Sequence, residues 1–259
     1  MASAENEARM ITLNPDNHLL MTFFSFLNHL PSYNVKEKII IAIDTAVEYD
    51  QTNFHIDGHI MSPLFALASA AKMFITLKKE TNPNHEFFIL PLKGTKAVLF
   101  DDFNNNCDIL DELMKDDYFS YRAGDKFDLD DLFVNIATTN EFWNLGCKTP
   151  NEMPPPFILR LVFLYNRSHT IPKIDKTVGV IQKLIDSPHF FMDVLVTHNP
   201  VSHENNCEKI FKVLQNIDSK GFSYFFNIGR DYNDLTKSIL KLIGHPLQRP
   251  LQSSFYHSL

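Results

Sequence analysis

The feature that most limits what this chain can fold into is an uninterrupted apolar run that ends in an acid, Lys38-Ile39-Ile40-Ile41-Ala42-Ile43-Asp44. A continuous β-branched run without alternating polar residues is typical of a central strand that is buried on both faces. Such strands occur where helices cover both sides of a parallel sheet. The run therefore predicts an α/β domain in which this strand lies near the middle of the sheet.

Further strand patterns alternate with helical patterns along the chain. Buried strands are expected at 157–165, 190–197 and 223–228, and helices at 61–78, 107–116, 129–138, 173–186, 204–215 and 231–243. This alternation predicts an open, mostly parallel, doubly wound sheet with right-handed crossovers. The turn Lys93-Gly94-Thr95 separates two more strand patterns, at 86–92 and 96–100. It predicts a hairpin and, with it, one antiparallel edge strand.

The length of 259 residues suits one large α/β domain with short appendages, because neither a repeat nor a low-complexity linker divides the chain. We expect an N-terminal extension at 1–35, one domain at 36–243 and a C-terminal tail at 244–259. The extension contains an apolar segment at 19–30, which is shorter than the roughly 20 residues that cross a bilayer. We interpret it as a packing strap or as a helix that a partner covers.

The composition argues against several classes of function. A net charge of −7 does not suit a non-specific nucleic-acid binder, which needs clustered Lys and Arg. Three scattered cysteines fit neither a disulfide framework nor a zinc site, and they predict a reducing compartment such as the cytosol or nucleus. The acidic N-terminus differs from a secretory signal. We therefore expect no nucleic-acid or membrane partner.

Chemistry in a doubly wound sheet is expected at the carboxyl ends of the strands, which here means after Asp44. The chain has only eight glycines, and no phosphate-binding loop follows this strand. A hard cation would need several oxygen ligands. Ala46 has no side-chain oxygen, Glu48 is long and charged, and Arg167 beyond the strand at 157–165 would repel a cation. We therefore expect neither a metal nor a cofactor, and we interpret Asp44 as a turn or capping acid.

Other groups that could carry chemistry have structural explanations. His55 and His59 flank Asp57-Gly58 and are expected to be surface histidines. Acid pairs such as Asp130-Asp131 suit a solvated helix face, because adjacent helical residues diverge by about 100°. Cys147 has no candidate base nearby in the sequence. The sequence therefore predicts no catalytic residue.

The tail begins where the last helix is expected to stop, at Gly244, and it reads His245-Pro246-Leu247-Gln248-Arg249-Pro250-Leu251. Its two prolines favour extended backbone and remove two donors. Leu247 and Leu251 could act as apolar anchors and Arg249 as a forked donor, so a stiff arm could dock on another protein at low entropy cost. We predict that these seven residues bind a partner. The alternative is a terminal strap packed on its own domain.

The run Leu240–Pro250 resembles the C-terminal end of the von Willebrand A-like scaffold subunits of the BRISC and BRCA-A deubiquitinase complexes. Weaker similarity lies in Lys38–Asp44, Met153–Phe163, Pro188–Asn199 and Asp218–Tyr224, so the resemblance spans most of 36–259. It implies a von Willebrand factor A-like fold and a place in both cytoplasm and nucleus. That fold holds a divalent metal through an Asp-x-Ser-x-Ser motif, from which this chain departs at Ala46 and Glu48.

The resemblance further implies a non-catalytic scaffold that works in the ubiquitin pathway and in DNA repair. Its partners would be a ubiquitin-conjugating-variant subunit and, through it, a metalloprotease deubiquitinase and that enzyme's pseudo-enzyme partner. Such an assembly cleaves lysine-linked ubiquitin chains of a non-degradative type. Two other hypotheses are a metal-dependent ligand-binding domain and a small-molecule α/β enzyme. Both would have to explain missing ligands or catalytic groups, so the sequence favours the scaffold.

Overall fold

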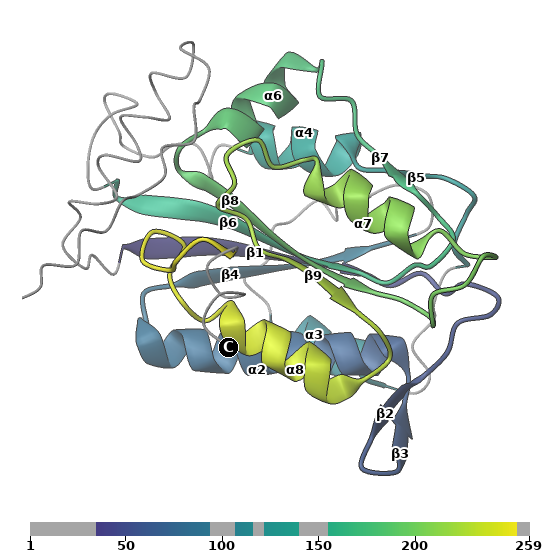
Figure 1. Ribbon diagram of the computed structural model, residues 1–259. Helices are drawn as coiled ribbons and strands as arrows, with labels where there is room; N and C mark the ends of the chain where they lie inside the picture. Colours follow the sequence, from purple (N-terminus) through teal and green to yellow (C-terminus); the bar gives the residue numbers. More distant parts are fainter. Residues whose placement is uncertain (1–34, 94–106, 116–121, 140–154, 253–259) are drawn as a thin grey trace, which may run out of the picture. The chain divides into compact units, whose positions relative to one another are not determined.

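The structure, a computed structural model, describes residues 35–93, 107–115, 122–139 and 155–252. Its centre is a five-stranded sheet in the order β4-β1-β6-β8-β9, and every neighbouring pair in it is parallel (Figure 1). The strands are β1 (Lys36–Asp44), β4 (Glu86–Leu92), β6 (Phe157–Tyr165), β8 (Phe190–Thr197) and β9 (Phe225–Ile228). The predicted α/β class and doubly wound sheet are confirmed, and they are consistent with a von Willebrand A-like fold.

Helices cover both faces of the sheet (Figure 1). One face carries α4 (Asp130–Thr138), α6 (Gly179–Asp186) and α7 (Cys207–Gln215), and the other carries α2 (Pro63–Thr81), α3 (Asp108–Leu113) and α8 (Tyr232–Lys241). Successive strand residues point to opposite sides, so each face has its own apolar cluster. Ile40 and Leu161 belong to the first cluster, and Ile41 and Val162 to the second. Burial on both faces explains why these strands are uninterrupted apolar runs.

Two small sheets lie beside the main one. β2 (Phe54–Ile56) and β3 (His59–Met61) form an antiparallel hairpin, and β5 (Phe127–Asp128) pairs in parallel with β7 (Pro172–Lys173). The hairpin turns at Asp57 and Gly58, whose φ angles are 46° and 82°. These left-handed conformations are those of a two-residue hairpin turn. His55 and His59 therefore lie on the two strands of a hairpin, and both are exposed as predicted.

Several boundaries differ from the prediction. α6 begins at Gly179, because Lys173 pairs in β7 and the Asp175 carboxylate accepts the N–H of Thr177 at 2.9 Å in an intervening turn. α7 begins at Cys207 rather than at the predicted residue 204, and α8 ends at Lys241 rather than at 243.

Some predictions lie outside the described residues. They are the antiparallel strand at 96–100, the apolar segment at 19–30 and Cys147. Within the described residues β4 is the sheet edge, and it pairs in parallel with β1. None of the helices described here has the length and apolar character needed to span a membrane.

Candidate functional site

Asp44, at the carboxyl end of β1, is buried in an ion pair with Arg167 from the loop after β6. Arg167 Nε donates to Asp44 Oδ2 at 2.8 Å, and a terminal nitrogen donates to Oδ1 at 2.9 Å. The guanidinium also lies 4.1 Å from the centre of the Phe127 ring. A bidentate pair of this kind neutralises the carboxylate and fixes its orientation. The guanidinium thus occupies the position beside Asp44 that a cation would need.

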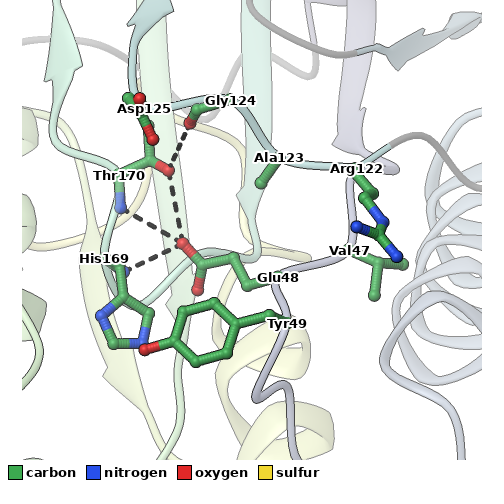
Figure 2. A pocket seen from close by; sticks show the side chains of 9 residues that line it. All are labelled: Val47, Glu48, Tyr49, Arg122, Ala123, Gly124, Asp125, His169 and Thr170. Atoms are coloured by element: carbon green, nitrogen blue, oxygen red, sulfur yellow. Dashed lines mark hydrogen bonds between the residues drawn. The ribbon is translucent and has the colours of Figure 1, made fainter.

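Glu48 is buried beneath the loop that follows β6. Its carboxylate accepts the backbone N–H group of Ser168 at 2.6 Å. It also accepts the N–H groups of His169 and Thr170, at 3.0 and 3.2 Å (Figure 2). Successive N–H groups that converge on one anion form a backbone nest, so the charge of Glu48 holds this loop in place.

Ala46 has a structural role too, since its N–H donates to Asp44 Oδ1 at 3.3 Å. The prediction of a turn acid at Asp44 is therefore confirmed, while its ion pair was not foreseen.

A second arginine joins the other strand ends. Arg230, after β9, donates to Asn166 Oδ1 at 2.6 Å and to Asn199 Oδ1 at 3.3 Å. Burial lowers the pKa of Arg230 to about 10. The same Asn199 oxygen accepts the N–H of Thr52 at 3.0 Å. Arg230 and Asn199 therefore tie together the loops that follow β1, β6 and β8.

One group of side chains near this edge could in principle hold a cation. Ligand atoms of Glu48, Asp50 and His169 lie within 4.8 Å of one another. However, both oxygens of Glu48 accept N–H bonds, and His169 Nε2 donates to Asp50 Oδ2 at 2.8 Å. Partial burial opposes the charged form of His169, but its bond to Asp50 raises the pKa overall. Backbone N–H groups thus satisfy Glu48, while His169 and Asp50 satisfy each other, and we interpret the three side chains as a loop-fixing cluster.

The tail follows a different path from the extended arm that the two prolines suggested. The N–H groups of Gln248 and Arg249 donate to the carbonyl of His245 at 2.8 and 3.0 Å, so residues 245–249 form a turn. Arg249 then forms a bidentate ion pair with Asp193 of β8, one bond of which measures 2.9 Å. The expectation of an extended segment at 245–249 is therefore wrong. The described part of the tail packs on its own domain, because a buried carboxylate lies within its reach.

Asp193 belongs to a row of ionic groups inside the domain, which we call the buried charge cluster: Glu37, Lys78, Arg160, Asp193 and Arg249. Arg160 Nε donates to Asp193 Oδ2 at 2.8 Å and a terminal nitrogen to Glu37 Oε2 at 3.0 Å, and Lys78 pairs with the other oxygen of Glu37. Burial alone would raise the pKa of Asp193, but Arg249 and Arg160 hold it below its usual value. For Glu37, Arg160 and Lys78 likewise outweigh burial and lower the pKa. The ion pairs therefore keep both carboxylates charged.

Sequence reasoning missed this cluster, although a signal for it existed. Arg160 and Asp193 are charged residues within strand runs that are otherwise apolar. In the parallel pairing of β6 with β8, Arg160 lies opposite Phe191. Asp193 follows Phe191 by two residues and points to the same side of the sheet, so it lies close to Arg160. Charges on neighbouring buried strands must be paired, because an unpaired buried charge is costly.

The tail residues predicted to bind a partner divide into two groups by burial. His245 and Pro246 are buried, and the Arg249 side chain is only 4% exposed. His245 Nε2 donates to the carbonyl of Val35 at 3.0 Å, which holds the start of the domain against the tail. Leu247 is half-buried, and the exposed residues are Gln248, Pro250 and Leu251. Partner binding by the seven residues stays a prediction, and only this second group could be reached from outside without opening the tail.

These observations describe an α/β domain, consistent with a von Willebrand A-like fold, in which an Asp–Arg ion pair closes the strand-end position. The chain is similar to proteins named BRISC and BRCA1-A complex member 1. It is 28% identical to the one from Xenopus laevis over 266 aligned residues, which cover 100% of this chain and 78% of that protein. It is 27% identical to the one from Homo sapiens over 238 residues, which cover 88% and 70%. The relative from Danio rerio is 26% identical, with coverage of 88% and 62%.

No family model matches the chain. The vertebrate homologues nevertheless agree with one another, and they confirm the resemblance seen in the sequence. Their name designates a member of a complex, that is, a subunit.

Proposed function

We propose that this chain is a non-catalytic scaffold subunit of a deubiquitinase complex of the BRISC or BRCA1-A type. The observation that carries the proposal is the similarity to complex members along the whole chain. It is supported at the strand ends, where Asp44 is neutralised by Arg167 and Glu48 holds a loop. Both acids therefore have structural roles in a place where chemistry would be expected.

In this proposal the chain binds a ubiquitin-conjugating-variant subunit and thereby joins the metalloprotease deubiquitinase and its pseudo-enzyme partner. The assembly cleaves non-degradative lysine-linked ubiquitin chains, while this chain supplies integrity and no chemistry. Binding between two folded subunits stabilises both by mass action, so loss of this chain should lower the abundance of its partner. Within the described part of the tail, the half-buried Leu247 and the exposed Leu251 are the leucines that could contact this partner.

We also propose that the chain works in both cytoplasm and nucleus. The support is chemical: Cys107 and Cys207, the cysteines in the described residues, are free thiols. Free thiols suit a reducing compartment.

The main alternative is a metal-dependent ligand-binding domain. The group Glu48, Asp50 and His169 is the observation that would favour it. Nothing in the described residues favours a small-molecule enzyme.

Affinity purification of the tagged chain from its own cells, followed by mass spectrometry, tests the proposal. The wild type should recover a ubiquitin-conjugating-variant subunit and a metalloprotease deubiquitinase. The variant Leu247→Asp/Leu251→Asp should recover less of both, since charge would oppose burial of the two anchors. Ile60→Asp is the matched control, because Ile60 is an exposed apolar residue on β3, and it should behave as the wild type. Recovery of neither subunit by the wild type would contradict the proposal.

A further inference from the structure

Two apolar side chains project from the loop that follows β1. Tyr49 is 91% exposed and Val47 is 38% exposed. The Tyr49 ring stacks on His169, with the ring centres 5.4 Å apart (Figure 2). Tyrosine is enriched among the residues that dominate protein interfaces, because it offers a large and rigid contact area at low entropy cost. The loop therefore displays surface suited to a protein contact.

The same loop is held firmly from within the domain. Glu48, between the two exposed residues, is fixed by the three N–H groups of the 168–170 loop. The carbonyl of Val47 accepts the N–H of Ala123 at 2.9 Å, and the carbonyl of Asp50 accepts Asn199 Nδ2 at 3.0 Å. A loop that is ordered before binding loses little entropy on binding, which favours affinity.

A pocket of about 630 Å³ opens beside this loop (Figure 2). Its opposite wall is the segment 122–125, and His169 and Thr170 complete the lining. Arg122 and Asp125, the two ends of that segment, are exposed. Neither forms an ion pair or a side-chain hydrogen bond with another described residue. The pocket thus has one available positive group and one available negative group.

We propose that this pocket docks an extended segment of a protein partner, in which an apolar side chain lies between an acidic and a basic residue. The acid would pair with Arg122 and the base with Asp125, while the apolar side chain packs on Tyr49 and Val47. Arg122 and Asp125 are three residues apart, so their Cα atoms are separated by at most ~10 Å. A partner segment with opposite charges two to four residues apart matches that span. This site is distinct from the tail and does not depend on the function proposed above.

Selection of a phage-displayed random 12-residue peptide library on the immobilised full-length chain tests this inference. Enriched peptides should carry the acidic, apolar and basic residues in that spacing. Their affinity, measured by fluorescence anisotropy, should fall about tenfold or more in Tyr49→Ala and in Arg122→Glu, as for interface residues of this kind. Selection on Arg122→Glu should replace the acidic residue of the peptides by a basic one.

The controls are Ile60→Ala, which alters an exposed apolar side chain on β3, and Tyr49→Phe, which keeps the ring. Both should bind the peptides as the wild type does. The melting temperatures of all variants should match that of the wild type, because the altered side chains are exposed. A selection without enrichment, or peptides that bind Tyr49→Ala as tightly as the wild type, would overturn the inference. Unchanged peptide charges after selection on Arg122→Glu would overturn it as well.

Discussion

Asp193 shows how one buried residue determines the path of a whole terminal segment. Its carboxylate accepts bonds from Arg160, from Arg249 and from the N–H of Tyr224, the last at 2.8 Å. The guanidinium of Arg249 also lies 3.8 Å from the centre of the Tyr224 ring. A buried carboxylate needs such partners, because a charge left unpaired in the interior is strongly destabilising. The sequence suggested that the forked guanidinium of Arg249 would bind a partner protein. It instead binds Asp193 inside the domain.

Arg249→Ala should lower the free energy of unfolding by roughly 3–5 kcal/mol, since it removes one partner of a buried pair. Urea denaturation followed by circular dichroism measures this change. Gln248→Ala is the matched control, because the neighbouring Gln248 is exposed, and its effect should stay within about 0.5 kcal/mol. Equal unfolding midpoints for Arg249→Ala and the control would show that the tail does not stabilise the domain.

The pair of Asp44 and Arg167 should behave as a coupled unit in a double-mutant cycle. Arg167→Met should cost roughly 3–5 kcal/mol, because it leaves a buried carboxylate without its guanidinium. The double variant Asp44→Asn/Arg167→Met should lose less than the sum of the two single changes, since it leaves no charge unpaired. Urea unfolding of the four proteins gives the coupling energy. Strict additivity would contradict the interpretation of a closed ion pair.

At the scale of elements, the bounds of strands were predicted most accurately where the strand is buried on both faces. The predicted bounds of β6 and β8 match the structure, because a strand buried on both faces leaves an unbroken apolar run. The hairpin of β2 and β3 was missed, although Asp-Gly is a strong hairpin signal, because each strand has only three residues and contains a polar histidine. The bonds of Arg249 to Asp193 and of Arg167 to Asp44 join residues far apart in the sequence. No local pattern encodes such pairs, so the sequence alone could not show them.

Gln252 offers a test at this scale, since it binds the edge of β9 that pairs with no other described strand. Its Oε1 accepts the N–H of Phe225 at 2.9 Å, and its Nε2 donates to the Phe225 carbonyl at 2.7 Å. Gln252→Ala should cost about 1 kcal/mol for the lost hydrogen bonds. It should also promote self-association through the uncovered edge, measured by light scattering at equal protein concentration. A variant as stable and as monomeric as Gln248→Ala would show that this contact has no protective effect.

For the whole molecule, two buried histidines beside the buried charge cluster, His85 and His245, imply a dependence of stability on pH. Burial lowers the pKa of His85 and of His245, each to about 4, even though Glu37 favours their charged forms. Both also lie near Lys78 and Arg160, which oppose protonation. In the unfolded chain a histidine titrates near ~6.5, so between these values the unfolded state binds more protons. The stability that these two neutral histidines contribute is therefore fully present above about pH 6.5 and is lost as the pH falls toward 4.

The melting temperature should accordingly fall as the pH is lowered from 7 to 4.5, in scanning calorimetry at constant ionic strength. His85→Asn should make the fall shallower, because one buried histidine no longer takes up a proton on unfolding. His203→Asn is the control, since the His203 side chain is 91% exposed, and its profile should follow the wild type. A wild-type profile that is flat over this range would contradict the assignment of buried neutral histidines.

The central claim is that the chain supplies structure and contacts to a ubiquitin-cleaving assembly, without chemistry at its strand ends. The most direct measurement is cleavage of lysine-linked ubiquitin chains in cell extract depleted of this chain, with purified variants added back at a temperature where each is folded. Wild type and Asp44→Asn/Arg167→Met should both restore cleavage, whereas Leu247→Asp/Leu251→Asp should not. Restoration by the tail variant, together with failure of the Asp44→Asn/Arg167→Met variant, would place the activity at the strand ends and contradict the scaffold account.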